Sequence, residues 1–206
     1  MSLVDDIRAF APGCEQEQAD KELLLACLER DPDVARRTSL AHLTTSAWTV
    51  DAAGESTLLC YHNIYDSWSW VGGHADGELD LACVAARELA EETGVSGACL
   101  VTRGLPAGAI FSIEALPVAG HVKRGSYVSS HVHLNVTYLF TADPAVATSV
   151  KPDENSAVRW VPIDDLLALS DEPWMCEHVY KKLIARTKEL LGHACWRDGR
   201  CGATSA

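Results

Sequence analysis

The sequence predicts an α/β protein in which helices cover both faces of a mixed β-sheet. Residues 131–140 alternate between apolar and polar side chains, as the two faces of a strand do. Residues 81–93 instead predict a helix, with Asp80 at its N-cap and Gly94 at its end. Strand-like and helical segments mix along the chain without strict βαβ alternation, which favours a mixed sheet over a purely parallel one.

The first third of the chain passes from a helix to a hairpin. Residues 16–37 predict a helix with one apolar face, and Pro32 either interrupts that helix or starts a new one, because proline lacks the N–H of a helix interior. Residues 42–50 and 57–62 are rich in β-branched and aromatic residues and predict two strands. The segment 51–54 between them ends in glycine and reads as a tight turn.

The remaining elements follow a glycine-containing loop over residues 71–78 and the helix at 81–93. The strands predicted after them, besides 131–140, are residues 98–102, 111–118 and 157–161. The helices predicted near the C-terminus are residues 163–169 and 173–191.

Composition and charge narrow the possible functions. The 206 residues suit one domain with extensions, and 17 Lys and Arg against 29 Asp and Glu give a net charge of -12. This excess of acid argues against binding to nucleic acid or to an anionic membrane, and no apolar run is long enough for a membrane span. The eight cysteines form no CxxC pair. Together with an N-terminus unlike a signal peptide, this favours a reduced, cytoplasmic protein.

The candidate metal-binding residues lie on the helix predicted at residues 81–93. Glu88, Glu91 and Glu92 stand at i, i+3 and i+4, so all three carboxylates occupy one helix face. Like charges at this spacing repel one another, and near the C-terminal end of a helix the dipole also disfavours them. A bound divalent cation would explain the arrangement, and oxygen ligands favour Mg²⁺, Mn²⁺ or Ca²⁺. A solvated acidic face is the alternative.

The surroundings of these carboxylates resemble the box of the Nudix hydrolases. That pattern is a Gly, five residues, a Glu, seven residues and then Arg-Glu-aliphatic-any-Glu-Glu-any-Gly-aliphatic. Here Gly73 takes the first position and residues 87–95 match the final block. The lead-in at residues 63–70 and the late loop Lys151-Pro-Asp-Glu-Asn155 also look like the family's. The resemblance implies a Nudix-type α/β/α sandwich with N- and C-terminal helical extensions.

One position of the box departs from the pattern. Leu79 stands where the family has its first Glu, with Glu78 and Asp80 on either side. Either neighbour could substitute, or the site could be weakened. Since the later block is intact, we expect metal binding to be retained.

The resemblance also implies roles for individual residues. Glu88, Glu91 and Glu92, helped by the Gly73 carbonyl, would hold Mg²⁺ (or Mn²⁺), and Arg87 would orient a box carboxylate. The metal would neutralise a diphosphate and activate the attacking water. The general base varies within the family, and the candidates here are Glu88, Glu154, His131 and His133. Glu154 is favoured because the family often places the base in its loop.

Substrate contacts are expected from two further groups of residues. Lys123, Arg124 and Tyr127 form the most basic stretch between the box and the late loop, and they either grip a phosphate or form a solvated hairpin. His131 and His133 share one face of their predicted strand, and they either line a pocket or are structural. His74 follows the double glycine of the box loop and is a candidate for substrate contact.

The predicted organisation is an N-terminal helical extension (1–38), a Nudix domain (39–170) and a C-terminal helix and tail (171–206). The expected activity is hydrolysis of a phosphoanhydride in a nucleoside diphosphate linked to another group, or in a related diphosphate. Two alternatives remain: an isomerase of isoprenoid diphosphates, which shares the fold but expects a Cys before the Gly-His pair, and a degenerate nucleotide-binding or regulatory domain. A homodimer is a family-level expectation. The tail group His193, Cys195 and Cys201 is a weak metal candidate.

Overall fold

Two long parallel strands lie at the centre of the computed structural model, which describes residues 2–106, 108–123 and 125–192. Strand β1 (Ala41–Val50) pairs with β9 (His131–Thr141) along its whole length. The alternation predicted for β9 is confirmed, since the five side chains expected on one face join the same hydrophobic core, while Leu139 on the other face joins the second. The five side chains are Val132, Leu134, Val136, Tyr138 and Phe140.

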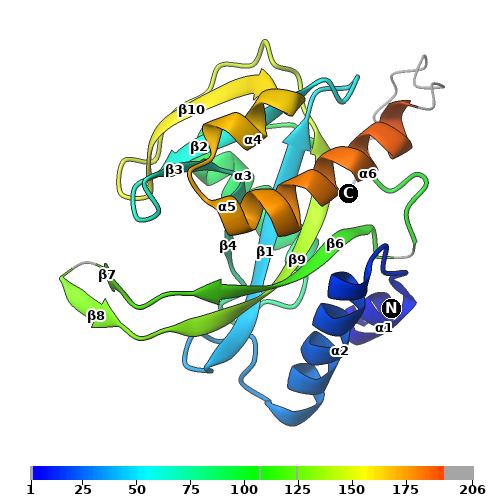
Figure 1. Ribbon diagram of the computed structural model, residues 1–206, viewed down its shortest axis with the longest axis vertical. Helices are drawn as coiled ribbons and strands as arrows, with labels where there is room; N and C mark the ends of the chain where they lie inside the picture. The colour runs from blue at the N-terminus through cyan, green and yellow to red at the C-terminus, as the bar shows by residue number, and fades with distance from the viewer. Residues whose placement is uncertain (1, 107, 124, 193–206) are drawn as a thin grey trace.

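Six more strands complete an eight-stranded mixed sheet (Figure 1). They are β2 (Ser56–His62), β3 (Ser67–Ser69), β4 (Val71–His74), β5 (Cys99–Leu100), β6 (Ile110–Val118) and β10 (Asn155–Pro162). The main order is β10-β2-β1-β9-β5, with β3 beside β2, β4 beside β1 and β6 beside β9. The pairing of β1 with β9 is parallel, and the other pairings in this sheet are antiparallel.

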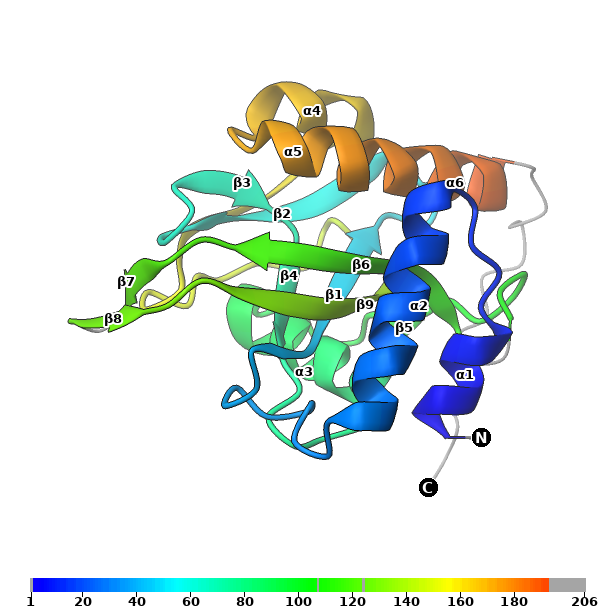
Figure 2. The same ribbon diagram turned by 60° about the horizontal axis from the view of Figure 1, so that its bottom comes forward.

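Helices cover both faces of the sheet, which confirms the predicted α/β/α sandwich (Figures 1 and 2). One layer contains α1 (Leu3–Ala9), α2 (Glu15–Arg30) and α3 (Leu81–Thr93). The other contains α4 (Leu166–Leu169), α5 (Pro173–Met175) and α6 (Lys181–Gly192), with a 3₁₀ turn η1 (Ile163–Asp165) and a π-helical turn η2 (Cys176–Tyr180). Leu43 of β1 faces the first layer, while Trp48 faces the second.

The N-terminal helices differ from the prediction at both ends. Helix α2 ends at Arg30, so the proposed continuation to residue 37 was wrong. Asp31 leaves the helix in an extended conformation, which suits a residue before Pro32. Helix α1 was not predicted because seven residues show little periodicity. It is stabilised by a capping box between Ser2 and Asp5 and by burial of Ile7.

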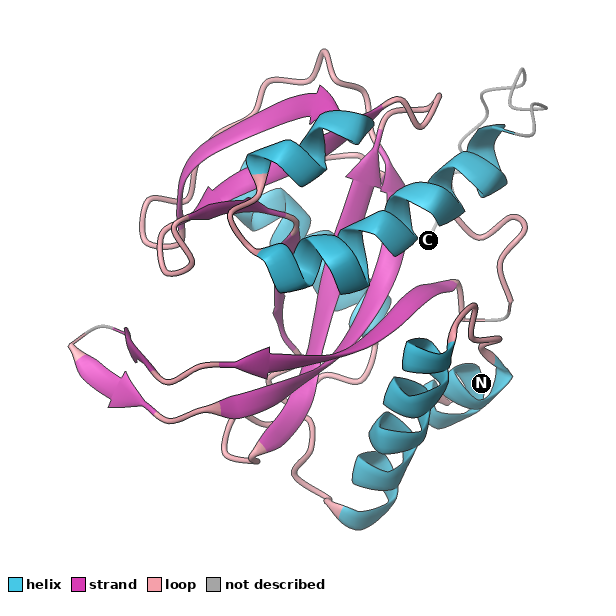
Figure 3. Ribbon diagram, in the orientation of Figure 1, coloured by secondary structure: helices cyan, strands magenta, loops and turns pink. Residues whose placement is uncertain are grey.

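The segment between β6 and β9 forms a separate two-stranded antiparallel ribbon. Strands β7 (His121–Lys123) and β8 (Ser126–Val128) pair with each other, and the ribbon extends away from the main sheet (Figures 1 and 3). The predicted C-terminal helix is present, but the π-helical turn separates α5 from α6. The strand predicted at 98–102 is confined to two residues of β5.

Buried charges fasten the N-terminal helices to the C-terminal helix. The Glu17 side chain is fully buried, and its carboxylate accepts hydrogen bonds from Arg186 of α6 at 2.7 and 2.9 Å. Lys182 of α6 lies 3.3 Å from Glu17 and 3.1 Å from the buried Glu114 of β6. These ion pairs therefore stabilise the packing of α2 against α6 and of α6 against strand β6 of the sheet. Among the described helices, none combines the length and apolar character of a membrane span.

Candidate active site

Helix α3 directs two of its carboxylates, those of Glu88 and Glu92, toward a cavity, because its ends are capped and its apolar face is packed against the core. The Asp80 side chain accepts a hydrogen bond from the Cys83 backbone N–H at its start. At its end Gly94 adopts φ 71°, a left-handed conformation that glycine reaches without strain. Leu81 and Leu89 pack into the core and set the rotation of the helix. Glu88 and Glu92 consequently face this cavity.

Three carboxylates meet at the wall of this cavity. Glu88, Glu92 and Glu154 each offer an oxygen, and these atoms all lie within 4.8 Å of one another. Glu92 is only 3% exposed. Burial, followed by the charges of Glu154 and Glu88, raises the pKa of Glu92 to about 8. Burial also raises the pKa of Glu88. The crowding is electrostatically unfavourable without a cation, and its oxygen-only donor set fits Mg²⁺ or Mn²⁺.

Glycine at position 73 allows strand β4 to approach this group. A Cβ atom at Gly73 would lie 2.5 Å from Cδ and 2.6 Å from Cγ of Glu88. No side chain fits there unless Glu88 moves. The β4 backbone and the Glu88 carboxylate thus form a close contact that depends on the absence of a side chain.

The loop before β10 delivers Glu154 to the helix. Asn155 is fully buried, and its amide donates a hydrogen bond to the Glu92 carbonyl oxygen at 2.9 Å. The Lys151 ammonium lies 3.0 Å from Glu154 and 3.4 Å from Glu91. Burial disfavours the charged form of Lys151, but the hydrogen bonds and negative charges of Glu154 and Glu91, with the charge of Glu88, together outweigh this and raise the pKa of Lys151. Asn155 and Lys151 therefore hold the loop against the C-terminal half of α3.

Glu91 and Arg87 lie at the outer edge of the site. Glu91 is half exposed and is not among the three carboxylates that converge; it contacts Lys151 and, at 4.0 Å, Arg87. Arg87 also lies 3.9 Å from Glu88, which places its guanidinium between two box carboxylates. Metal ligation by Glu91 and the orienting role of Arg87 stay predictions.

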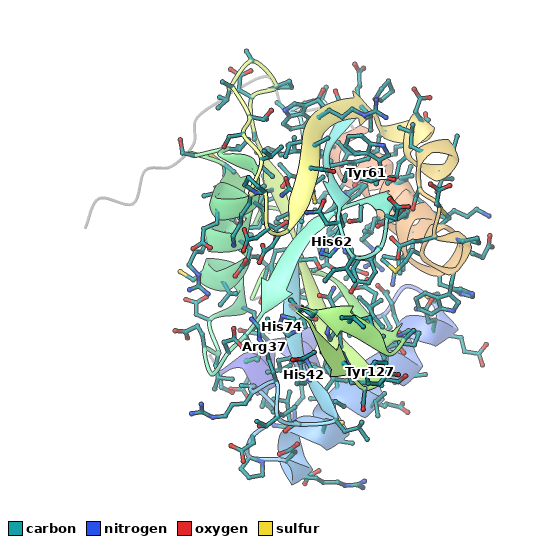
Figure 4. All side chains as sticks on the ribbon, turned by 90° about the vertical axis from the view of Figure 1, so that its left-hand side faces the viewer. Arg37, His42, Tyr61, His62, His74 and Tyr127 are labelled. Atoms are coloured by element: carbon teal, nitrogen blue, oxygen red, sulfur yellow. The ribbon has the colours of Figure 1, made fainter. Side chains whose placement is uncertain are left out.

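The cavity beside the carboxylates has a volume of about 730 Å³. This size falls within the usual range of small-molecule sites. Glu88, Glu92 and Glu154 lie on its wall, and Lys123 of β7 and several histidines complete it. Figure 4 shows Arg37, His42 and His74 close together at one end of the sheet.

The NUDIX domain family matches residues 40–183 of the chain. The chain belongs to this family. The match confirms the family predicted from the sequence and identifies the protein as a Nudix hydrolase. No curated protein matches the chain.

Solved Nudix structures resemble the chain at low identity. A NUDIX family hydrolase from Clostridium perfringens is 19% identical, with a TM-score of 0.49 over 69% of this chain and 95% of the other. An Ap4A hydrolase from C. elegans, in a binary complex, is 15% identical, with a TM-score of 0.47 over 74% and 98%. A MutT NUDIX hydrolase from Burkholderia pseudomallei is 18% identical, with a TM-score of 0.45 over 71% and 97%.

The Nudix box of this chain departs from the family pattern at Leu79, and the structure shows what its neighbours do. Leu79 is 53% exposed. The Glu78 carboxylate accepts hydrogen bonds from the backbone N–H groups of Leu79 and Asp80, while Asp80 caps α3. Both acids organise the loop, and neither belongs to the group of three converging carboxylates.

The residues expected to contact substrate divide into two sets. Lys123, His74, His131 and His133 line the cavity. Tyr127 is 71% exposed on the ribbon and is not among the cavity residues. Arg124 and the tail group of His193, Cys195 and Cys201 lie outside the described residues.

Four residues at the site were not predicted from the sequence. Lys151 and Asn155 belong to the late loop, whose similarity to the family was the available signal. His42 and Arg37 also line the cavity. Arg37 forms a two-point ion pair with Asp76, with distances of 2.7 and 2.6 Å. No sequence pattern marked these two, because their proximity to the box arises from strand pairing.

Proposed function

We propose that this Nudix hydrolase cleaves a phosphoanhydride bond in a nucleoside diphosphate linked to another group, or in a related diphosphate, with Mg²⁺ or Mn²⁺. The observation that carries the proposal is the convergence of Glu88, Glu92 and Glu154 on a cavity of small-molecule size. A bound divalent cation supplies charge neutralisation for the diphosphate and lowers the pKa of water. Membership of the family supports a nucleotide-type substrate.

The surrounding residues have distinct tasks in this proposal. Glu154 accepts a proton from the attacking water, and Lys151 positions its carboxylate from 3.0 Å. Glu88 and Glu92 hold the cation, and Gly73 keeps Glu88 in place by leaving it room. Lys123 lies on the cavity wall, where its ammonium can bind a phosphate oxygen.

The test is phosphate or nucleotide release from a panel of substituted nucleoside diphosphates with Mg²⁺. We expect turnover by the wild type and a loss of roughly 100-fold or more in both Glu92→Gln and Glu154→Gln. Glu22→Gln is the matched control, because Glu22 is exposed on α2 far along the chain from the box. Undiminished turnover in Glu92→Gln would show that the carboxylate group is wrongly assigned as the metal site.

The alternatives predict different results on the same protein. Binding of nucleotides without any turnover would support a regulatory domain. Isomerisation of an isoprenoid diphosphate would support the second alternative, although Gly72 stands where that enzyme expects a Cys before the Gly-His pair. Cys60 lies near Glu92, but it does not take the place of the cysteine that the isomerase expects. Its thiol is fully buried, its pKa is raised by burial, and it is not among the cavity residues.

The setting of the enzyme is also a proposal. We expect a cytoplasmic protein that acts on a small molecule. We also expect it to bind neither nucleic acid nor membranes, because its net charge of -12 would be repelled by their negative charges. The family suggests a homodimer, which light scattering of the purified protein tests directly.

A further inference from the structure

A cluster of histidines lies in the same cavity as the carboxylates but has a different chemistry. Imidazole nitrogens of His42, His131 and His133 all lie within 4.8 Å of one another. His74 packs beside them, with its ring centroid 5.2 Å from that of His42 and 4.8 Å from that of His133. None of these nitrogens belongs to the carboxylate group described above.

Strand pairing explains why four residues so far apart in sequence meet. His42 on β1 is the direct register partner of His133 on β9. His131 lies two residues earlier on the same face of β9, since side chains alternate along a strand. His74 on β4 pairs with Thr44, two residues beyond His42. The cluster is thus built on three adjacent strands, which hold its members more rigidly than a loop could.

The hydrogen bonds of the cluster fix which nitrogens carry protons. His42 Nδ1 lies 2.8 Å from the Ser39 carbonyl oxygen, and His131 Nδ1 lies 2.8 Å from that of Ser129. A carbonyl oxygen can only accept, so both rings carry a proton on Nδ1. In their neutral forms, both rings present an Nε2 lone pair. Metal-binding histidines are commonly oriented in this way, by a backbone carbonyl oxygen that accepts a hydrogen bond from the ring nitrogen not bound to the metal.

The lone pair of His42 has no partner among the described residues. His42 is 3% exposed, and its buried Nε2 accepts no hydrogen bond there. A buried polar atom without a partner carries an energetic penalty, so its presence calls for a ligand. The His131 and His133 Nε2 atoms lie 3.1 Å apart, so without a metal His133 donates a hydrogen bond to His131, and a metal ion between them would replace that hydrogen bond. Two nitrogens bound to one tetrahedral zinc ion at about 2.0–2.1 Å lie roughly 3.3 Å apart, which is close to this spacing.

We propose that His42, His131 and His133 bind a transition-metal ion of the zinc class, in a centre separate from the carboxylate group. Imidazole donors select Zn²⁺, Co²⁺ or Ni²⁺ over Mg²⁺, which prefers oxygen. Three protein ligands leave a coordination position open, as in zinc centres that bind water or substrate. His133 binds through Nε2 in the neutral tautomer that carries the ring proton on Nδ1.

The orientation of the imidazole rings also favours a metal ion over an anion at these histidines. His42 and His131 direct their Nδ1 atoms at backbone carbonyl oxygens, so in the neutral rings it is the Nε2 lone pairs that are left for a ligand. Neutral imidazoles donate lone pairs to a cation but attract a phosphate only weakly. The nearby Arg37 is already paired with Asp76 through two hydrogen bonds.

The test is Co²⁺ titration of chelator-treated full-length protein without a histidine tag. Excess Mg²⁺ is present to occupy the carboxylate group. We expect a single equivalent of Co²⁺ to produce visible d–d bands without thiolate charge transfer, and Zn²⁺ to displace it. Glu92→Gln should keep the bands whether or not the protein hydrolyses any diphosphate, so this result is independent of the proposed function.

Matched variants locate the ligands. His131→Asn and His133→Asn should each lose the bands, whereas His178→Asn should keep them because His178 is exposed on η2. Circular dichroism checks that each variant folds. If either ligand variant fails to fold, X-ray absorption of the zinc-loaded wild type decides: three imidazoles in the first shell support the proposal. An oxygen-only shell, thiolate charge transfer, or unchanged bands in folded His131→Asn and His133→Asn would overturn it.

Discussion

The buried carboxylate of Glu17 offers the clearest energetic test of how the helical extensions are held. It accepts hydrogen bonds from Arg186 and lies 3.3 Å from Lys182, while its own side chain is fully buried. Glu17→Gln keeps the shape of the side chain but removes its charge. Breaking one partner of a buried ion pair typically destabilises a protein by about 3–5 kcal/mol, because the opposite charges remain buried.

We therefore expect Glu17→Gln to lower the free energy of unfolding by about 3–5 kcal/mol at pH 7. In a domain of this size that corresponds to a fall in Tm of roughly 6–20 °C. Urea denaturation of the metal-free protein measures the first quantity. The matched control is Glu22→Gln on the exposed side of the same helix, which should change stability by less than about 0.5 kcal/mol.

Acid supplies a second, independent check on Glu17. Burial disfavours its charged form, but the hydrogen bond from Arg186 and the charge of Lys182 outweigh this and hold the pKa below its ordinary value of 4.5. The pKa of Glu17 is therefore lower in the folded protein than in the unfolded one. The resulting stabilisation is complete above the pKa of the unfolded state and is lost as the pH falls through the pKa of the folded state. The difference between wild type and Glu17→Gln should therefore shrink below pH 4.5. A difference under about 1 kcal/mol at pH 7 would refute the reasoning.

Three further perturbations follow from contacts at the site and in the core. Gly73→Ala should abolish most turnover while changing Tm little, because the new Cβ would displace the flexible Glu88 side chain; activity equal to wild type would contradict the contact. Asn155→Ala should lower stability by about 1–3 kcal/mol in urea denaturation and reduce kcat, since it frees the Glu92 carbonyl and loosens the loop that carries Glu154. Thr187→Val should destabilise by about 1–3 kcal/mol, because the buried Trp48 indole N–H loses its acceptor at 2.9 Å; a neutral result would mean that another acceptor replaces it.

The sequence predicted well those features whose cause is local. The alternation along β9 and the caps of α3 depend on neighbouring residues, and both were read correctly. The box carboxylates share a helix face, so the convergence of Glu88 and Glu92 followed from their spacing. Glu154 was also placed near the site, through its resemblance to the family's late loop.

Features that depend on distant pairing were missed. His42 faces its partners because β1 runs parallel to β9, and nothing near residue 42 specifies that register. The burial of Glu17 was not predicted, because its partners Arg186 and Lys182 lie on α6, far along the chain. Residues 1–38 were likewise predicted as a separate extension, because no local pattern indicated that α2 shares buried charges with α6.

The pairing of Glu17 with Arg186 also has a consequence for the order of folding. The two residues are 169 positions apart in the chain. Contacts of such separation form late, because a long loop must close before they stabilise anything. During synthesis α2 leaves the ribosome well before α6, so the Glu17 carboxylate meets its cation only after Arg186 has also emerged. The paired state of the buried Glu17 carboxylate therefore depends on a segment of the chain that is made much later than α2 itself.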